Sequence, residues 1–421
     1  MKKIPYVVFT GAGASNAIGL PTMKDFFENF LDENRNVKPT HLHMHKTSKI
    51  LFKKILDSLY SGKTNYDLEE IMGVLYDAKH FSNSQMLKMY MSDDIFTTIA
   101  RKIRDEHSQK FTITKPLQMN SANMEDFVCA IKNEMTKEYH SLHKQFDRLL
   151  YDIERTIRDS LSNINHKENA RVYGPFISML VRDLQNKDSA KYLKTIPFYT
   201  TNYDMSIDYC FNQNLIDSNE QTLYAQISEQ NLLFYNGFNG NRNGVWSRES
   251  YSNAYKGNKI SVPYYKLHGS IFWQKAPQSD SVTTGGSIED KPYSYPHDSK
   301  QLYISYPAEK KELIGEPYSF NYMSLERDLH HADSLIIIGF SFRDPKIVEI
   351  FKIALECNED LEIKVVVPED AIGSCEFHEL NQFLAHRSGG RSKIKKLAYK
   401  FGDEATKMEL FQQIIPSLTY S

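Results

Sequence analysis

The chain has 421 residues, of which 25% are charged, and its formal net charge is −2 at pH 7. This length exceeds the roughly 100–200 residues of a typical single domain, so the chain holds two domains or one core with a large insertion. The small net charge excludes a basic footprint for nucleic acid over the whole surface.

The first predicted element is a strand over residues 4–10, which ends at the Gly-Ala-Gly-Ala-Ser turn of residues 11–15. A β-branched run that stops at such a turn is typical of a βα unit, so we expect a parallel sheet to begin here. No stretch of the sequence has the roughly 20 apolar residues that cross a bilayer. We therefore expect a cytoplasmic protein without membrane contact.

A large helical insertion is predicted at residues 25–165. Segments such as 51–60 and 139–161 fit helices, and the region contains very little glycine or proline. The flanking residues, 1–24 and 166–421, are expected to form the domain that holds the sheet.

Neither zinc nor a disulfide is predicted from the cysteine and histidine pattern. No two cysteines have the Cys-x-x-Cys spacing of a structural zinc site; the four are Cys129, Cys210, Cys357 and Cys375. Three histidines alternate inside the predicted insertion, at His41, His43 and His45. They favour a solvated face over a metal site, because no acidic or cysteine partner lies close by.

Further strands are predicted where apolar runs return beyond the insertion, at residues 195–200, 264–267, 335–338 and 362–367. The last two are Leu, Ile and Val runs, which are typical of central parallel strands buried on both faces. With the first strand they predict an α/β fold, a Rossmann-like parallel sheet with helices on both faces. Loop excursions rich in Asn, Gly, Ser and Tyr are expected near residues 236–258 and 278–296.

The glycine turn after the first strand has the residue types of a phosphate-binding loop. Gly11, Ala12 and Gly13 let a pyrophosphate approach the backbone, where amide groups at a helix N-terminus stabilise its charge. Asn16 replaces the third glycine of the dehydrogenase pattern, so the motif is not that of a hydride-transfer enzyme. A tight turn without a ligand is the alternative.

Polar side chains follow the next two predicted strands. Asn202 and Asp204 come after the strand at 195–200, and His268 ends the strand at 264–267. Ligands bind at the carboxyl edge of open α/β sheets, and a histidine there titrates near neutrality. The alternative for Asp204 is an Asx turn in which it caps a following helix.

The fourth motif is Gly-Phe-Ser-Phe-Arg-Asp at residues 339–344, after the most apolar strand. Its Gly339 and Ser341 are placed to hold a phosphate or a ribose. Any one of these motifs can be a plain βα turn, but four of them after four strands favour a common ligand site.

This ordered set of motifs resembles the sirtuin superfamily, and above all its divergent bacterial branch associated with antiphage defence. The resemblance covers the predicted Rossmann core, about half of the chain, and implies that NAD is bound as a substrate. It places Gly339 and Ser341 on the adenosine side of the site. The phosphate and ribose loop then consists of Gly11, Ala12, Gly13 and Ser15.

The resemblance also implies roles for the three polar residues at the strand ends. Asn202 matches the residue that orients the nicotinamide ribose and the attacking group. Asp204 matches the residue that contacts the nicotinamide carboxamide. His268 matches the general base, which activates a ribose hydroxyl or a water.

Two departures from the protein-deacylating sirtuins determine which reaction we expect. The chain lacks their four-cysteine zinc ribbon, and Thr22-Met23-Lys24 stands where they have Asp-Phe-Arg. The resemblance therefore implies an NAD glycohydrolase, with water as the acceptor and nicotinamide and ADP-ribose as products. The alternatives are an NAD-dependent protein deacylase and a catalytically silent module that senses NAD or ADP-ribose.

Partners are implied by the same resemblance. The defence-associated relatives indicate a homo-oligomer that works beside a separate ATPase of the HerA type, or beside an Argonaute-like protein. The sequence has no Walker A motif, so such an ATPase is another chain. Nucleic acid is then expected to be reached only through that partner.

Overall fold

The computed structural model describes residues 2–21, 148–212, 218–239, 244–275, 281–284, 302–304, 315–373, 378–386 and 393–416. Internal contacts divide the chain into two compact units. The first consists of Met1–Phe26 together with Ile157–Ser421, and the second is Phe27–Thr156. Most of the insertion predicted at 25–165 lies outside the described residues, and residues 148–162 at its end are helical. The domain boundaries predicted after residues 24 and 165 stay a prediction.

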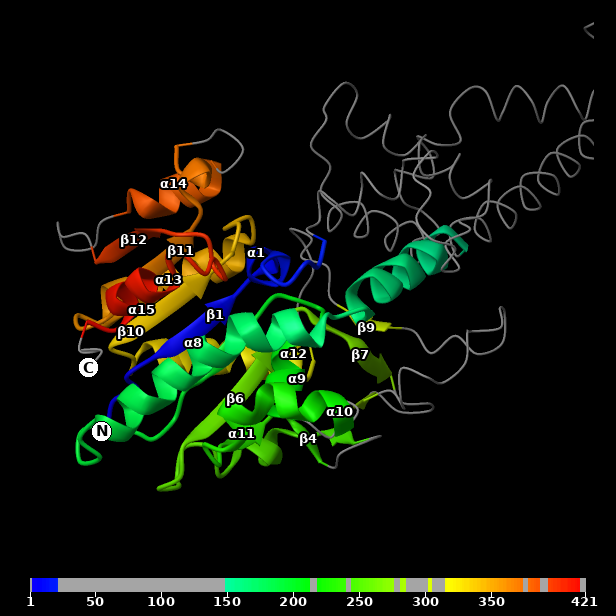
Figure 1. Cartoon of the computed structure of the whole chain (residues 1–421), viewed down its shortest axis with the longest axis horizontal. Coiled ribbons are helices and arrows are strands. Elements are labelled where there is room, and N and C mark those ends of the chain that lie inside the picture. Colours follow the sequence, from blue (N-terminus) through cyan, green and yellow to red (C-terminus); the bar gives the residue numbers. More distant parts are fainter. Residues whose placement is uncertain are drawn as a thin grey trace, which may run out of the picture. The chain divides into compact units, whose positions relative to one another are not determined.

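Seven strands form a parallel sheet in the first unit (Figure 1), in the order β12, β11, β10, β1, β2, β6 and β3. The bounds are Val7–Thr10 for β1, Phe198–Thr200 for β2, Leu233–Tyr235 for β3, Ser261–Lys266 for β6, Ser334–Ile338 for β10, Glu362–Val367 for β11 and Ile394–Ala398 for β12. This sheet confirms the predicted α/β class. The five strands predicted from the sequence are β1, β2, β6, β10 and β11, and the structure adds β3 and β12 at the two edges.

Helices cover both faces of the sheet (Figure 1). On one face, Phe9 of β1 packs edge-on against Phe351 of α13, with 5.1 Å between ring centroids. On the other, Phe176 of α8 lies 6.3 Å from Phe411 of α15. Every residue of β1 and β10 is buried between these layers, which is why all but one residue of each strand, Thr10 and Ser334, are apolar. The helices that matter here are α8 (His166–Asn186), α9 (Ser206–Phe211), α12 (Tyr318–Leu329), α13 (Pro345–Cys357) and α15 (Lys407–Ile414).

A second, antiparallel sheet has the order β4, β5, β8, β7 and β9. Its strands are β4 (Phe238–Asn239), β5 (Val245–Trp246), β7 (Gly269–Lys275), β8 (Val282–Thr284) and β9 (Leu302–Ile304). The described parts of the two predicted loop excursions thus contribute short strands. Because β7 begins only three residues after the end of β6, Leu267-His268 connects these two strands and thereby the two sheets.

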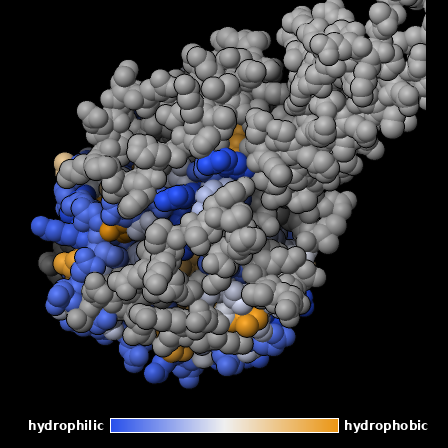
Figure 2. All heavy atoms as spheres, turned by 90° about the vertical axis from the view of Figure 1, so that its right-hand side faces the viewer, coloured by the Kyte–Doolittle hydropathy of each residue, from blue (hydrophilic) through white to orange (hydrophobic). Residues whose placement is uncertain are grey.

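The described helices and one face of the surface bear on contact with a membrane. Within the described residues, no helix combines the length and the apolar character needed to cross a bilayer. On the face shown in Figure 2, the coloured surface is mainly hydrophilic and its apolar residues are scattered. Single exposed apolar residues of this kind are ordinary on a folded protein.

Candidate functional site

The chain order creates a topological switch point between β1 and β10. From β1 the sheet continues through β2 on one side, whereas from β10 it continues through β11 on the other. Thr10 and Ile338 are register partners at the carboxyl ends of these two strands. Ligands of open α/β sheets bind in the crevice outside such a point, and the glycine turn and the Gly-Phe-Ser-Phe-Arg-Asp motif both begin there.

Glycine is required at this point because two backbone turns touch. Gly339 has a φ of +64°, and a Cβ atom on it would lie 2.2 Å from the Ala14 nitrogen. Conversely, a Cβ atom on Gly11 would lie 2.7 Å from the Gly339 oxygen. The Gly11 amide donates to the Ile338 oxygen and the Gly13 amide to the Gly339 oxygen, both at 2.9 Å. These glycines therefore join the two turns, and the ligand contacts predicted for them stay a prediction.

The loop beyond Gly339 is held in an unusual backbone conformation. Phe342 has a φ of +63°, which is a genuine outlier for a bulky residue and marks local strain. Its buried ring stacks on Phe383 at 4.6 Å and lies 5.0 Å from the Phe340 ring. This aromatic packing stabilises the loop that presents Ser341, a partly exposed residue, and Asp344 at the sheet edge.

Hydrogen bonds connect the glycine turn to the motif after β2. The side-chain Nδ2 of Asn202 donates to the Gly11 oxygen at 2.9 Å and to Ser15 Oγ at 2.8 Å. Ser15 Oγ in turn donates to Asp204 Oδ2 at 2.6 Å. Three of the predicted site residues, from segments nearly 190 positions apart, therefore form one network.

Asp204 also has the structural role that its sequence position allowed. Its Oδ1 accepts from the Ser206 amide at 2.9 Å and from the Ser206 hydroxyl, which forms an Asx turn just before α9, although the N-cap of that helix is Met205. Both carboxylate oxygens are thus hydrogen-bonded within the protein, and the side chain is buried. The Asx turn is present, and the predicted contact with a nicotinamide carboxamide stays a prediction.

His268 pairs with a residue to which the sequence alone gave no role. Its Nε2 lies 3.0 Å from Asp344 Oδ2, and the exposed fractions are only 3% and 7%. Asp344 is the N-cap of α13, where its Oδ1 accepts from the amides of Lys346 and Ile347. A carboxylate can only accept, so the bond puts the proton of a neutral His268 ring on Nε2 and leaves Nδ1 as the basic atom.

Asp344 is held in its charged form. Burial acts to raise the pKa of this carboxyl, but the hydrogen bond and the charge of His268, together with the two helix amides, hold its pKa below the ordinary value. The Tyr203 ring lies 6.5 Å from the His268 ring, so the dyad of His268 and Asp344 adjoins the motif that carries Asn202.

Asp344 is expected to stabilise the fold in a defined pH range. A carboxyl whose pKa is lower in the folded chain contributes stability above its unfolded pKa of about 3.9, and this stability is lost as pH falls through the folded pKa. We expect the wild type to exceed Asp344→Asn in free energy of unfolding at about pH 5, and the gap to shrink below about pH 3.9. Urea denaturation across this range measures it, and a gap unchanged at low pH would contradict the assignment.

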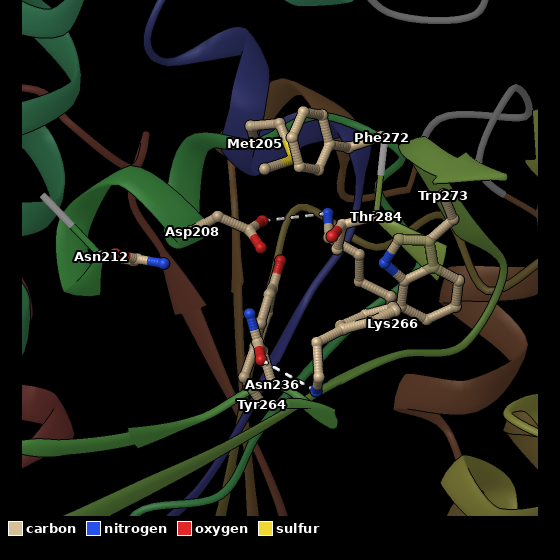
Figure 3. Close-up of a pocket in the computed structure, with 10 residues that line it drawn as sticks. Met205, Asp208, Asn212, Asn236, Tyr264, Lys266, Phe272, Trp273 and Thr284 are labelled. Carbon is tan, nitrogen blue, oxygen red and sulfur yellow. Dashed lines mark hydrogen bonds and ion pairs between the residues drawn. The ribbon is translucent and has the colours of Figure 1, made fainter. Parts of the chain in front are cut away.

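A pocket opens beside the motif after β2, with about 440 Å³ of empty space including open solvent. In Figure 3, Lys266 of β6 points toward Asp208 of α9 within this pocket, and Trp273 and Phe272 of β7 form its wall. Lys266 Nζ and Asp208 Oδ2 lie 3.3 Å apart, and both side chains are buried. The sequence did not single out either residue, although a lysine directly before Leu-His-Gly at a strand end was a signal.

No metal centre emerges from the described part of the chain. Among these residues, no group of three or more His, Cys, Asp or Glu is placed to hold a metal ion. Cys210 is buried and Cys357 is exposed, and both are free thiols. The remaining candidates, namely His41, His43, His45, Cys129 and Cys375, lie outside the described residues.

Comparison with known proteins gives one family match, to the SIR2-like domain at residues 197–386. This stretch contains the motifs of Asn202, His268 and Gly339, and the match supports the resemblance to the sirtuin superfamily. No curated protein sequence is significantly similar to the chain.

Solved structures of Sir2 homologues are similar at low sequence identity. One is a mutant in complex with 2′-O-acetyl ADP ribose, with 12% identity, a TM-score of 0.37, and 100% of this chain and 95% of that chain covered. Another is an NAD complex, with 12% identity, a TM-score of 0.36, and coverages of 98% and 91%.

Proposed function

We propose that the protein is an NAD glycohydrolase that cleaves the bond between nicotinamide and ribose. The observation that carries the proposal is the dyad of His268 and Asp344, which adjoins the motif of Asn202 through the Tyr203 ring at the carboxyl edge of the sheet. The SIR2-like domain match over this region supports NAD as the ligand. In this proposal Asn202 and His268 are catalytic, and the two glycine-containing turns bind the rest of NAD.

The chemistry of the reaction suits these residues. Departure of nicotinamide leaves an oxocarbenium-like ribose, which needs positioning and electrostatic support more than covalent help. Asn202 supplies an oriented amide, and the buried Asp344 carboxylate is a fixed negative charge behind His268. His268 Nδ1 is then the atom that accepts a proton from water or a ribose hydroxyl, with Asp344 stabilising the ring as it becomes charged.

The wider setting follows from the sequence resemblance alone. We propose a homo-oligomer that depletes NAD in antiviral defence, beside a separate HerA-type ATPase or an Argonaute-like protein. An unrestrained hydrolase is toxic to its host, so the proposal includes an activating signal from such a partner. Nucleic acid enters only through that partner.

The test is NAD consumption by the purified protein, with nicotinamide and ADP-ribose followed by chromatography. We expect Asn202→Ala and His268→Ala to lower turnover by roughly 10² to 10⁴, because each removes a positioned group at the reacting ribose. His330→Ala is the matched control, since His330 is exposed and belongs to no part of the site, and it should leave turnover unchanged.

Each outcome distinguishes the competing functions. Equal turnover in the wild type and in both site variants would show that these residues are not the catalytic ones. Binding of NAD without turnover, even with candidate partners present, would favour a sensing module. Consumption of an acylated peptide in step with NAD would favour a deacylase.

A further inference from the structure

Three successive backbone carbonyls after β2, those of residues 202–204, accept hydrogen bonds from residues at the junction of β6 and β7. Lys266 Nζ donates to the Asn202 oxygen at 3.4 Å and to the Asp204 oxygen. The Tyr203 oxygen between them accepts from the Ile271 amide at 3.0 Å and from the Ser270 hydroxyl at 3.2 Å. The backbone that carries Asn202 is therefore fixed by the strands on either side of His268, with Lys266 supplying the bonds at its two ends.

Burying the Lys266 side chain costs free energy, and its polar contacts offset this cost. The side chain is 2% exposed, and its ammonium group donates to two carbonyls and forms an ion pair with the Asp208 carboxylate. Burying an ammonium costs several kcal/mol unless each donor finds an acceptor and the charge is balanced. Burial also raises the pKa of Asp208 against the attraction of Lys266, so the two groups depend on each other.

We propose that Lys266 is a positioning residue for the reaction, acting through the backbone of Asn202 and Asp204, and that Asp208 balances its charge. This inference rests on the proposed function, because it assigns the geometry of that same site. The balance matters for the fold, since a buried ammonium without a counter-charge is strongly destabilising. A lysine with only a structural role would need a single buried acceptor. Lys266 instead donates to the backbone oxygens of both Asn202 and Asp204.

Lys364 provides a matched control within the same sheet. It is also buried, its Nζ donates to the Ile414 oxygen at 2.8 Å, and it pairs with Glu362 at 3.1 Å. It lies on β11, and these two partners among the described residues, Ile414 and Glu362, are outside the proposed site. Lys364→Met therefore removes the same kind of buried group without touching the motif after β2.

The experiment compares Lys266→Met with Lys364→Met. We expect Lys266→Met to lower kcat for NAD by roughly 10- to 100-fold, because a displacement of about 1 Å at a reacting group has that scale of effect. The Kd of ADP-ribose should stay within about twofold, since the glycine turns remain intact. Lys364→Met should reduce thermal stability similarly and leave kcat unchanged.

Two further variants keep the test decisive if Lys266→Met does not fold. Asp208→Asn retains both carbonyl bonds of Lys266, and the double variant Lys266→Met with Asp208→Asn removes them without leaving a buried charge unpaired. The double variant should lose more kcat than Asp208→Asn alone. Equal kcat in these two variants, or an equal kcat loss in Lys364→Met, would overturn the positioning role.

Hydrogen exchange separates this inference from the proposed function. In Lys266→Met, and not in Lys364→Met, the peptide that covers residues 199–206 should exchange its amides faster, whether or not the wild type consumes NAD. Faster exchange with an inactive wild type would leave Lys266 as the group that fixes this motif and reject the glycohydrolase. Unchanged exchange would reject the positioning role itself.

Discussion

Replacing Asp344 by asparagine is expected to lower NAD turnover by roughly 10² to 10⁴ while the fold is retained. Asp344 Oδ2 lies 3.0 Å from His268 Nε2 and accepts the proton on that nitrogen. An asparagine side chain can instead present its own N–H to Nε2. The ring would then carry its proton on Nδ1 and lose the basic atom to which the proposal assigns proton transfer, and a change of tautomer of this kind has cost about 10⁴ in a serine protease triad. Steady-state kinetics of purified Asp344→Asn measures the effect.

The comparison with Asp344→Ala separates orientation of His268 from capping of α13. Asparagine is as good an N-cap as aspartate, whereas alanine loses a cap worth about 0.5–2 kcal/mol. We expect Asp344→Asn to be as inactive as Asp344→Ala but clearly more stable. An active Asp344→Asn beside an inactive Asp344→Ala would show that only the helix cap matters, and the dyad would then have no part in the reaction.

The central strands were predictable from sequence because their physics is local. The run at residues 335–338 is apolar at every position, a pattern typical of a strand buried on both faces. The edge strands were not. Leu233–Tyr235 has only three residues, and Ile394–Ala398 contains two lysines, so each becomes a strand through pairing with its neighbour in the sheet rather than through its own pattern.

The site was predictable as a set of positions and not as a set of contacts. Asn202 and His268 were identified because both follow strands, and parallel strands bring their carboxyl ends to one edge. The bond from His268 to Asp344 spans 76 positions, so no local rule reveals it. The signal that was available is Asp344 directly before Pro345, a helix start that places the carboxylate at the same edge.

Lys266 illustrates the second limit, since a single sequence does not show which charged residue is buried. Lysine is almost never fully buried unless it is paired, so a lysine at the end of a predicted strand suggests a solvated position. The partner that makes burial tolerable, Asp208, lies on a helix 58 positions earlier in the sequence, as the numbering of the two residues shows. Only the fold brings the two together.

Gly339→Ala is expected to be the most destabilising small substitution at the switch point, at roughly 2–5 kcal/mol. The left-handed backbone, at a φ of +64°, costs a residue with a Cβ about 1–2 kcal/mol. The new atom would also lie 2.2 Å from the Ala14 nitrogen, and overpacking of this kind adds roughly 1–3 kcal/mol. Because the clash is with backbone, no side-chain rotation relieves it, and the glycine turn must move.

Gly19→Ala is the control for that prediction, and it isolates the backbone effect. Gly19 has a φ of +84°, and a Cβ atom there would meet none of the described residues within 4 Å, so the conformational cost of about 1–2 kcal/mol is expected. Urea denaturation gives both free energies of unfolding, and the binding of ADP-ribose by Gly339→Ala shows whether the displaced turn still holds a phosphate. Equal losses in the two variants would mean that the contact between the two turns is loose. A larger loss in Gly339→Ala, accompanied by weaker ADP-ribose binding, would establish the close approach of the turns as a requirement of both the fold and the site.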